Sequence, residues 1–182
     1  MKPIKTSVII IGRICSGKTT YSKEIAKSLN TQVKSFSTYL KYYCEINGIQ
    51  INRENLQNIG EDLINTQPQV FLENVINFEK VTSEIVIFEG VRHKIIFDGL
   101  NNLSEKTIPI FISADPETRF NRYINRDKKV DMKISFEQFL AIDNHPVEME
   151  IESLKSKCIL IVDSGNQPIN LTIEKIKNLL YK

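Results

Sequence analysis

The chain alternates short apolar runs, rich in β-branched residues, with longer segments whose apolar residues recur at helical spacing. The nearly continuous apolar runs predict buried strands at residues 7–11, 32–36, 84–88, 108–112 and 158–162. Helical spacing predicts helices over residues 18–29, 38–46, 52–64, 68–78, from 116 onward, and 171–180. Such alternation favours an α/β fold of three layers, in which a five-stranded parallel sheet carries helices on both faces.

Several expected helices begin at recognisable residues. Asn52 can cap the helix that follows it, Pro68 suits a first helical turn, and Asp115 precedes Pro116 at another start. Asn144 is the expected cap of a further helix that begins near Pro146. Ligands of parallel α/β sheets bind beyond the carboxyl ends of the strands. We therefore expect one cleft to be formed by Gly12, Phe88, Glu89, Ala114, Asp115, Asp163 and Ser164.

Composition narrows the class of protein. The 182 residues are 41% hydrophobic and 25% charged, which predicts one globular domain over residues 1–182 and excludes a disordered chain. The net charge of +2 gives no broad electrostatic case for nucleic acid or an anionic membrane as the main partner. Three scattered cysteines without a Cys-x-x-Cys pair indicate neither a disulfide framework nor a zinc site. With no apolar run of membrane length and no signal-peptide pattern, a cytoplasmic protein is expected.

One motif carries specific chemistry. The run Gly12-Arg13-Ile14-Cys15-Ser16-Gly17-Lys18-Thr19 matches G-x-x-x-x-G-K-[ST] and lies between an expected strand and an expected helix. The glycines let backbone N–H groups point at phosphate oxygens, and the helix that begins near Lys18 adds its positive end. Lys18 is expected to reach the β- and γ-phosphates, and Thr19 to bind Mg²⁺. We assign this run, together with Thr20, to the nucleotide site.

Arginine is scarce, which makes its positions informative. The chain has 18 lysines and six arginines, yet Arg119, Arg122 and Arg126 all lie on the helix that follows Asp115. At about 100° per residue these three side chains fall on one narrow stripe. Cations on one stripe repel each other unless an anion neutralises them, and the flat guanidinium suits phosphate. The stripe therefore predicts an anion-binding helix face.

The order of these motifs supports a resemblance. No N-K-x-D motif is present, which argues against a GTPase, whereas Glu89-Gly90-Val91-Arg92-His93 follows the third strand and the arginine stripe follows the fourth. The chain resembles the nucleoside monophosphate kinase-like P-loop kinases, which include adenylate kinases, phage deoxynucleoside monophosphate kinases and dephospho-CoA kinases. It is most similar to a branch of small nucleotide kinases labelled as AAA-family ATPases. The features shared with that branch are Arg53-Glu54-Asn55-Leu56-Gln57-x-x-Gly60, Gly90-Val91-Arg92-His93 and His145-Pro146-Val147-Glu148.

The resemblance implies roles on the donor side. ATP would be the phosphoryl donor, and Glu89 would hold Mg²⁺ through water where relatives carry Asp. Arg119 would stack on the ATP base, while Arg122 and Arg126 would reach the phosphates. Gly165, in the loop after the last strand, would contact the adenine through its backbone. The alternatives are that Glu89 is an acid at the sheet edge and that the loop at 163–166 is an ordinary turn.

The resemblance also implies an acceptor side. A helical region at about residues 37–80 would bind the acceptor, and a short lid at about 127–134 would close over it. Lys41 stands where relatives carry Arg, and the Asp expected near it is missing. Arg92 would bind the acceptor phosphate, unless it is a surface arginine, and the segment from His145 would cap a helix or take part in catalysis. The substrate-binding residues implied on this side are Ser37, Lys41, Arg53, Gln57 and Arg92.

Three functions follow from this pattern. The first is an ATP- and Mg²⁺-dependent phosphotransferase acting on a small phosphorylated acceptor, a nucleoside or deoxynucleoside monophosphate. The second is a kinase of a hydroxyl acceptor, such as a nucleoside, a coenzyme precursor or a nucleic-acid end, with Glu89 as the base. The third is a nucleotide-binding regulatory ATPase without an acceptor. A monomer or a homodimer is expected, with a small-molecule nucleotide substrate and no membrane.

Overall fold

A computed structural model describes residues 4–78, 83–126 and 134–181, except for the side chains of Arg53 and Arg126. The strands are β1 (Ile4–Ile11), β2 (Gln32–Ser35), β3 (Ile85–Glu89), β4 (Ser104–Ser113) and β5 (Leu160–Asp163). The helices are α1 (Lys18–Leu29), α2 (Phe36–Ile46), α3 (Arg53–Thr66), α4 (Pro68–Asn77), α5 (Lys94–Leu103), α6 (Pro116–Arg126), α7 (Phe136–Asp143), α8 (Pro146–Ser153) and α9 (Ile169–Leu180). A 3₁₀ turn, η1 (Leu154–Lys157), follows α8.

The five strands form one parallel sheet in the order β2-β3-β1-β4-β5. Glu89, the last residue of β3, is in register with Ser35 on one side and Ile10 on the other. At the far edge, Ser113 of β4 is in register with Asp163 of β5. The carboxyl ends of the strands therefore meet at one edge of the sheet, where parallel α/β folds bind their ligands.

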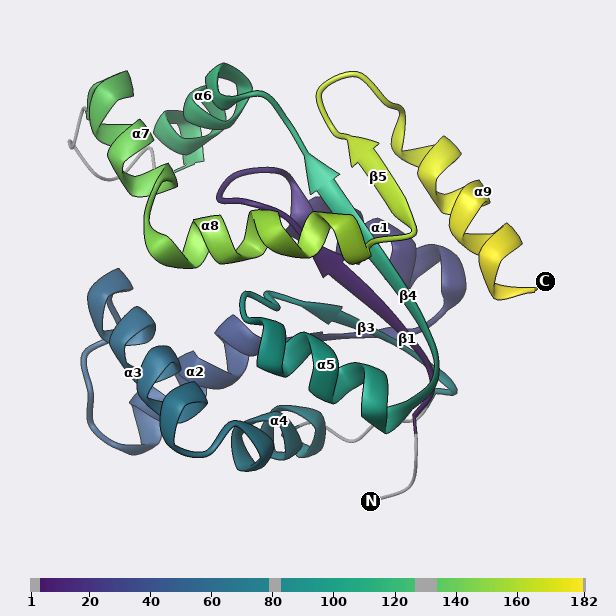
Figure 1. Ribbon diagram of the computed structural model, residues 1–182, viewed down its shortest axis with the longest axis horizontal. Helices are drawn as coiled ribbons and strands as arrows, with labels where there is room; N and C mark the ends of the chain where they lie inside the picture. Colours follow the sequence, from purple (N-terminus) through teal and green to yellow (C-terminus); the bar gives the residue numbers. More distant parts are fainter. Residues whose placement is uncertain (1–3, 79–82, 127–133, 182) are drawn as a thin grey trace.

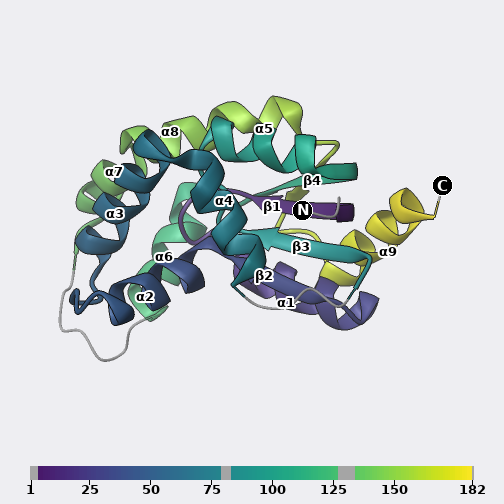
Figure 2. The same cartoon turned by 90° about the horizontal axis from the view of Figure 1, so that it is seen from below.

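The sheet is buried on both faces, which accounts for its continuous apolar strands. On one face lie α4, α5 and α8 (Figure 1). Their side chains Phe71, Leu100 and Ile151 belong to the same core as Ile9 and Phe88 of the strands. On the other face α1 and α9 contribute the side chains Tyr21, Ile25 and Ile176, which pack against Val8, Ile10, Ile110 and Val162. Figure 2 shows α5 and α8 on one side of the sheet and α1 on the other. The three-layer α/β prediction is confirmed, and the layers are those of a P-loop fold.

Most helix boundaries agree with the expected signals. Asn52 caps α3, its side-chain oxygen accepting from the Asn55 N–H at 2.8 Å, and α4 begins at Pro68. The expected cap of α8 is wrong: His145, not Asn144, precedes the helix, and its ring nitrogen accepts from the Val147 N–H. Asn144 instead ends α7, because its backbone N–H bonds the carbonyl of Leu140.

Periodicity predicted neither α5 nor α7. The sequence of α5 contains Gly99 and two asparagines, all poor helix formers, and no side chain from its own N-terminus caps it. The cap comes from α8, where Glu150 accepts a hydrogen bond from the Lys94 N–H at 2.7 Å. A helix start that depends on a residue 56 positions away leaves no local signal.

Within the part of the chain that the structure describes, no helix combines the length and apolar character needed to cross a membrane.

Candidate functional site

The loop between β1 and α1 has the backbone that the glycine motif predicts. A side chain at Gly12 would place its Cβ 2.2 Å from the carbonyl oxygen of Ile112, so the loop can approach β4 only with glycine there. Gly17 has φ 96°, a conformation that favours glycine, directly before the first turn of α1. Cys15 has φ 57°, which is the left-handed region for a residue with a Cβ. Because of these conformations, the loop at residues 12–17 bends around the amino end of α1. This loop is called the phosphate loop below.

The side chain of Lys18 folds back into this loop. Its ammonium donates to the carbonyl oxygen of Arg13 at 2.7 Å, within the same loop. Burial, together with the smaller effect of the nearby Arg92 charge, lowers the pKa of Lys18 to about 8 against the opposing effect of Glu148 and Glu89. A lysine whose charged form is disfavoured by burial would gain an electrostatic partner from a bound triphosphate. This arrangement suits a phosphate-binding lysine.

A second feature at the loop fits a magnesium ion. The hydroxyl of Thr19 donates to Oε1 of Glu89 at 2.7 Å, so two oxygen ligands from α1 and β3 converge on one point. Mg²⁺ prefers hydroxyl, carboxylate, water and phosphate oxygens, and protein sites supply few of its ligands directly. The donor set therefore fits Mg²⁺ bound beside a nucleotide, with Thr19 and Glu89 as the residues that hold it.

We expect Glu89→Gln to lower turnover by roughly 10²-fold while changing ATP affinity little. The amide keeps the size of the carboxylate and removes the charge that would hold a metal ion, whereas the loop backbone could still bind a triphosphate. Steady-state kinetics and calorimetric titration with ATP measure the two quantities. Glu24→Gln on the exposed side of α1 is the matched control. Turnover unchanged at saturating Mg²⁺ would reduce Glu89 to an acid that ends a strand.

The loop opens into a cavity of about 1310 Å³. Its walls come from the phosphate loop, the carboxyl end of β3, and helices α2, α3, α6 and α8. This one cavity thus brings together residues from both the donor and the acceptor side of the expected site. The expected site residues that line it are Ile14, Cys15, Gly17, Lys18, Thr19, Thr20, Ser37, Gln57, Glu89, Arg92 and Arg122.

Arg122 joins the loop after β5 to the phosphate loop. Its guanidinium donates to Oγ of Ser164 at 2.8 Å, to the Ser164 carbonyl at 3.0 Å and to the Cys15 carbonyl at 3.4 Å. The Ser164 hydroxyl in turn donates to the carbonyl of Ser16 at 2.7 Å. Ser16, which is part of the loop, is fully buried. Arg122 therefore lies beside the phosphate loop, where its charge can act on nucleotide phosphates.

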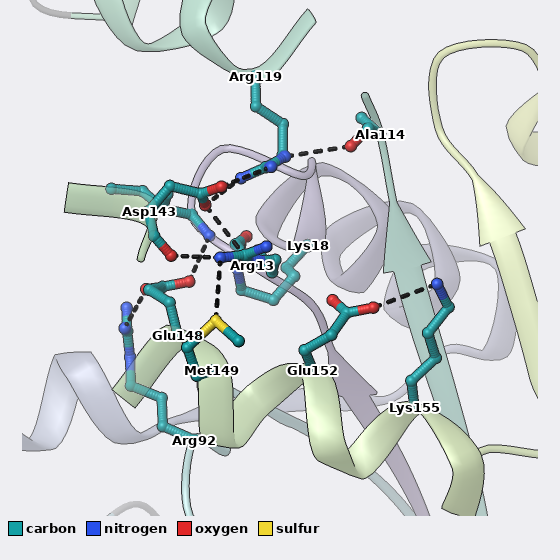
Figure 3. Close-up of polar contacts among 11 residues, drawn as sticks. Arg13, Lys18, Arg92, Ala114, Arg119, Asp143, Glu148, Met149, Glu152 and Lys155 are labelled. Carbon is teal, nitrogen blue, oxygen red and sulfur yellow. Dashed lines mark hydrogen bonds and ion pairs between the residues drawn. The ribbon is translucent and has the colours of Figure 1, made fainter. Parts of the chain in front are cut away.

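Arg119 differs from its expected place. Its side chain is buried, with a residue exposure of 3%, and its two terminal nitrogens bond the two carboxylate oxygens of Asp143 on α7 (Figure 3). Its Nε donates to the Ala114 carbonyl at 3.1 Å, and its guanidinium carbon lies 5.8 Å from the ring centre of Phe139. The guanidinium is thus committed to an internal ion pair and does not line the main cavity. A planar face is not exposed for stacking on a base.

Asp143 is also the partner of Arg13. The Arg13 guanidinium donates to the Asp143 carbonyl and approaches its Oδ1 at 3.3 Å. One buried carboxylate therefore binds an arginine from the phosphate loop and another from α6. Sequence reasoning assigned no role to Asp143, because nothing local to α7 indicates which cations reach it.

Five further expected residues do not line the cavity, namely Gly12, Arg13, Ser16, Lys41 and Gly165. Lys41 is exposed on α2, one turn beyond Ser37, because the buried face of that helix is formed by Phe36 and Tyr39. Gly165 lies in the turn after β5, where its N–H donates to the Asp163 carboxylate at 2.9 Å. That N–H is satisfied within the turn.

On the acceptor side, α8 contacts both α3 and the end of β3. Gln57 bonds the His145 ring, with Nε2 to Nε2 at 3.0 Å, which joins α3 to the start of α8. Arg92 forms an ion pair with the buried Glu148 at 2.8 Å. The resemblance had marked the His145–Glu148 segment without fixing its role. The structure places it against Arg92.

Some expectations fall outside the described residues. The side chains of Arg53 and Arg126 and residues 127–133 of the expected lid belong to this group. Ile134, the last residue of the expected lid, lines the cavity.

Comparison with solved structures identifies the fold. A shikimate kinase from Bacteroides thetaiotaomicron has a TM-score of 0.61, with 17% identity over 97% of this chain and 99% of that one. A gluconokinase from Sinorhizobium meliloti 1021 has a TM-score of 0.57, with 12% identity over 98% and 97% of the two chains. At these identities the likeness establishes the P-loop kinase fold alone.

Curated relatives are also distant in sequence. A tRNA dimethylallyltransferase of Fusobacterium nucleatum subsp. nucleatum is 24% identical over all of this chain, which spans 61% of that relative's length. A UPF0200 protein of Thermoplasma volcanium is 22% identical over 96% of both chains. The AAA domain family model matches residues 8–154, a range that runs from β1 through the phosphate loop and Glu89 to the end of α8. The chain therefore belongs to this AAA domain family of P-loop proteins.

Proposed function

We propose that the protein is an ATP- and Mg²⁺-dependent phosphotransferase that acts on a small phosphorylated acceptor, a nucleoside or deoxynucleoside monophosphate. The observation that supports this function is that one cavity is lined by Lys18, Thr19 and Glu89, on the donor side, and also by Arg92. A phosphotransferase needs its donor and acceptor sites in one space, so that the γ-phosphoryl group can pass directly between them.

The acceptor half of the cavity suits a nucleoside monophosphate. Arg92 lines it with a side chain that is 47% exposed, so guanidinium surface is left for a phosphate beside the bond to Glu148. Apolar side chains of α3 and the loop before it form the adjoining wall, and amides stand among them. Apolar walls with a few polar groups are the usual environment of a bound nucleobase. The wall residues are Ile51, Asn52, Leu56, Gln57 and Ile64.

In this proposal the residues of the chain act by position and charge. Lys18 and Arg122 neutralise the oxygens of the transferring phosphoryl group, and Arg92 holds the acceptor phosphate in line with it. A metal ion on Thr19 and Glu89 would supply further charge at the β- and γ-phosphates. An acceptor phosphate oxygen attacks the γ-phosphorus while the bond to the ADP oxygen breaks. No base is needed, because the attacking oxygen is already ionised.

A hydroxyl acceptor is the second candidate, and the cavity's carboxylates favour it. Glu61 and Glu89 both line the cavity, and a hydroxyl needs a carboxylate to accept its proton. Glu89 already bonds Thr19 at 2.7 Å, which ties it to the metal position, so a base role would compete with metal binding.

The deciding experiment is a screen of acceptors with ATP and Mg²⁺, with products identified by mass. Nucleoside and deoxynucleoside monophosphates form one arm, and nucleosides, coenzyme precursors and 5′-hydroxyl oligonucleotides form the other. A nucleoside diphosphate product supports the proposal, and a new phosphomonoester supports the second candidate. ADP and free phosphate alone, across both arms, would overturn both and leave a regulatory ATPase.

A further inference from the structure

Glu148 contacts the donor loop and the acceptor arginine at the same time. Its Oε1 accepts from Nη1 of Arg92 at 2.8 Å, and its Oε2 accepts from the backbone N–H of Ile14 at 2.8 Å (Figure 3). The side chain of Glu148 is only 3% exposed. A buried carboxylate with both oxygens bonded has little freedom to move. It therefore fixes the separation between the phosphate loop and the guanidinium of Arg92.

The sequence of α8 holds Glu148 in this place. Pro146 begins the helix after the His145 cap, so Glu148 falls in the first turn, where the helix dipole favours a negative charge. Val147 and Ile151, on either side of it along the chain, are buried in the core between α8 and the sheet. Packing and capping thus aim the carboxylate at the loop independently of any ligand.

We infer that Glu148 is a positioning residue, which sets Arg92 at the distance and orientation from the phosphate loop that transfer to an acceptor phosphate requires. This inference rests on the proposed function, in which Arg92 binds that phosphate. An arginine side chain has many rotamers, and fixing one of its nitrogens before the substrate arrives removes an entropic cost of binding. Misplacement of a reacting group by about 1 Å can cost about 10² in rate.

Loss of the Glu148 charge should affect acceptor binding and donor binding differently. The triphosphate is held by Lys18, the other loop N–H groups and the positive end of α1. In Glu148→Gln the amide oxygen can still accept from Ile14, so the loop keeps its bond, whereas the charge that holds Arg92 is lost. Acceptor affinity should therefore fall while ATP affinity stays.

Helix α8 supplies a matched control. Glu150, two residues on, also bonds the segment after β3, through the Lys94 N–H at 2.7 Å and the His93 ring at 2.9 Å. It makes the same kind of contact from the same helix and does not line the cavity. Glu150→Gln therefore tests for a general loosening of α8.

The experiment is calorimetric titration of the full chain with two probes in the presence of Mg²⁺. ATP fills the donor site alone, and diadenosine pentaphosphate, or its adenosine–thymidine counterpart, spans donor and acceptor sites. We expect the wild type to bind a pentaphosphate at least about tenfold more tightly than ATP. Glu148→Gln should lose about tenfold or more for the pentaphosphate, the effect of one charge-assisted hydrogen bond, and stay within about twofold for ATP. Glu150→Gln should change both affinities less than about twofold.

A double-mutant cycle with Arg92→Ala shows whether Glu148 acts through Arg92. In that background Glu148→Gln should have no additional effect on the pentaphosphate. A persisting loss, an equal loss for ATP, or no loss at all would each overturn the positioning role and leave the proposed function intact. A wild type that binds neither pentaphosphate more tightly than ATP would overturn the nucleotide acceptor itself, and the inference with it. A fall in turnover with unchanged pentaphosphate affinity would assign Glu148 to the chemical step instead.

Discussion

Replacing Lys18 by alanine is expected to abolish phosphoryl transfer and to leave the protein folded. The lysine ammonium lies in the phosphate loop, and it donates a hydrogen bond to the Arg13 carbonyl at 2.7 Å. Loss of a charge that stabilises the transferring group removes on the order of 10³-fold or more in rate. Loss of that charge should not destabilise the fold. Burial lowers the pKa of Lys18 to about 8, which means that the ammonium is less favourable in the folded protein than in the unfolded chain.

Product formation from ATP, far-UV circular dichroism and the thermal midpoint together test this prediction. Lys23→Ala removes a lysine from the exposed side of the same helix and should retain wild-type activity and stability. If Lys18→Ala turned over ATP at the normal rate, the loop would not be the donor site. If it failed to fold, the lysine would be a structural residue, and its loss of activity would say nothing about phosphates.

The fold could be predicted from sequence where its signals are local. The strand that ends at Ile11, the glycines of the loop and the start of α1 at Lys18 occupy one continuous stretch, and the positive φ of Gly17 is the conformation that glycine favours. Glu89 was predicted for a similar reason, because the last residue of a parallel strand must lie at the ligand-binding edge. Helix α5 was missed because its cap, Glu150, comes from another helix.

The site was predicted less completely, because two of its carboxylates, Asp143 and Glu148, come from α7 and α8, which pack on the loop. Helical spacing correctly placed Arg119 near Arg122, yet it could not show that Asp143 would take Arg119 out of the cavity. In the same way, the segment that contains Glu148 carried a recognisable motif without indicating a partner. Both acids act through residues 24 or more positions away, so only the packing of α7 and α8 on the loop brings them together with their arginines.

Because Asp143 binds two arginines, its replacement should have a large effect on stability. Asp143→Asn should lower the free energy of unfolding by about 3–5 kcal/mol, because the buried Arg119 would be left without a counter-charge. For a chain of this length the thermal midpoint would fall by roughly 10 °C. Thermal unfolding followed by circular dichroism gives this value. Asp98→Asn is the control, since its partly exposed pairs with Lys94 and Lys157 should each contribute less than about 1 kcal/mol.

A rescue variant distinguishes an uncompensated charge from simple loss of shape. In the double variant Asp143→Leu, Arg119→Met both buried charges of the pair are removed, and apolar side chains of similar size can pack beside Phe139. We expect most of the lost stability to return. Arg13 would lose the Asp143 carboxylate that it approaches at 3.3 Å and keep its bond to the backbone carbonyl at position 143, so full recovery of stability is not expected. If the double variant were as unstable as Asp143→Asn, the contribution of this pair would lie in its hydrogen-bond geometry, and charge compensation would not explain why α6 and α7 stay together.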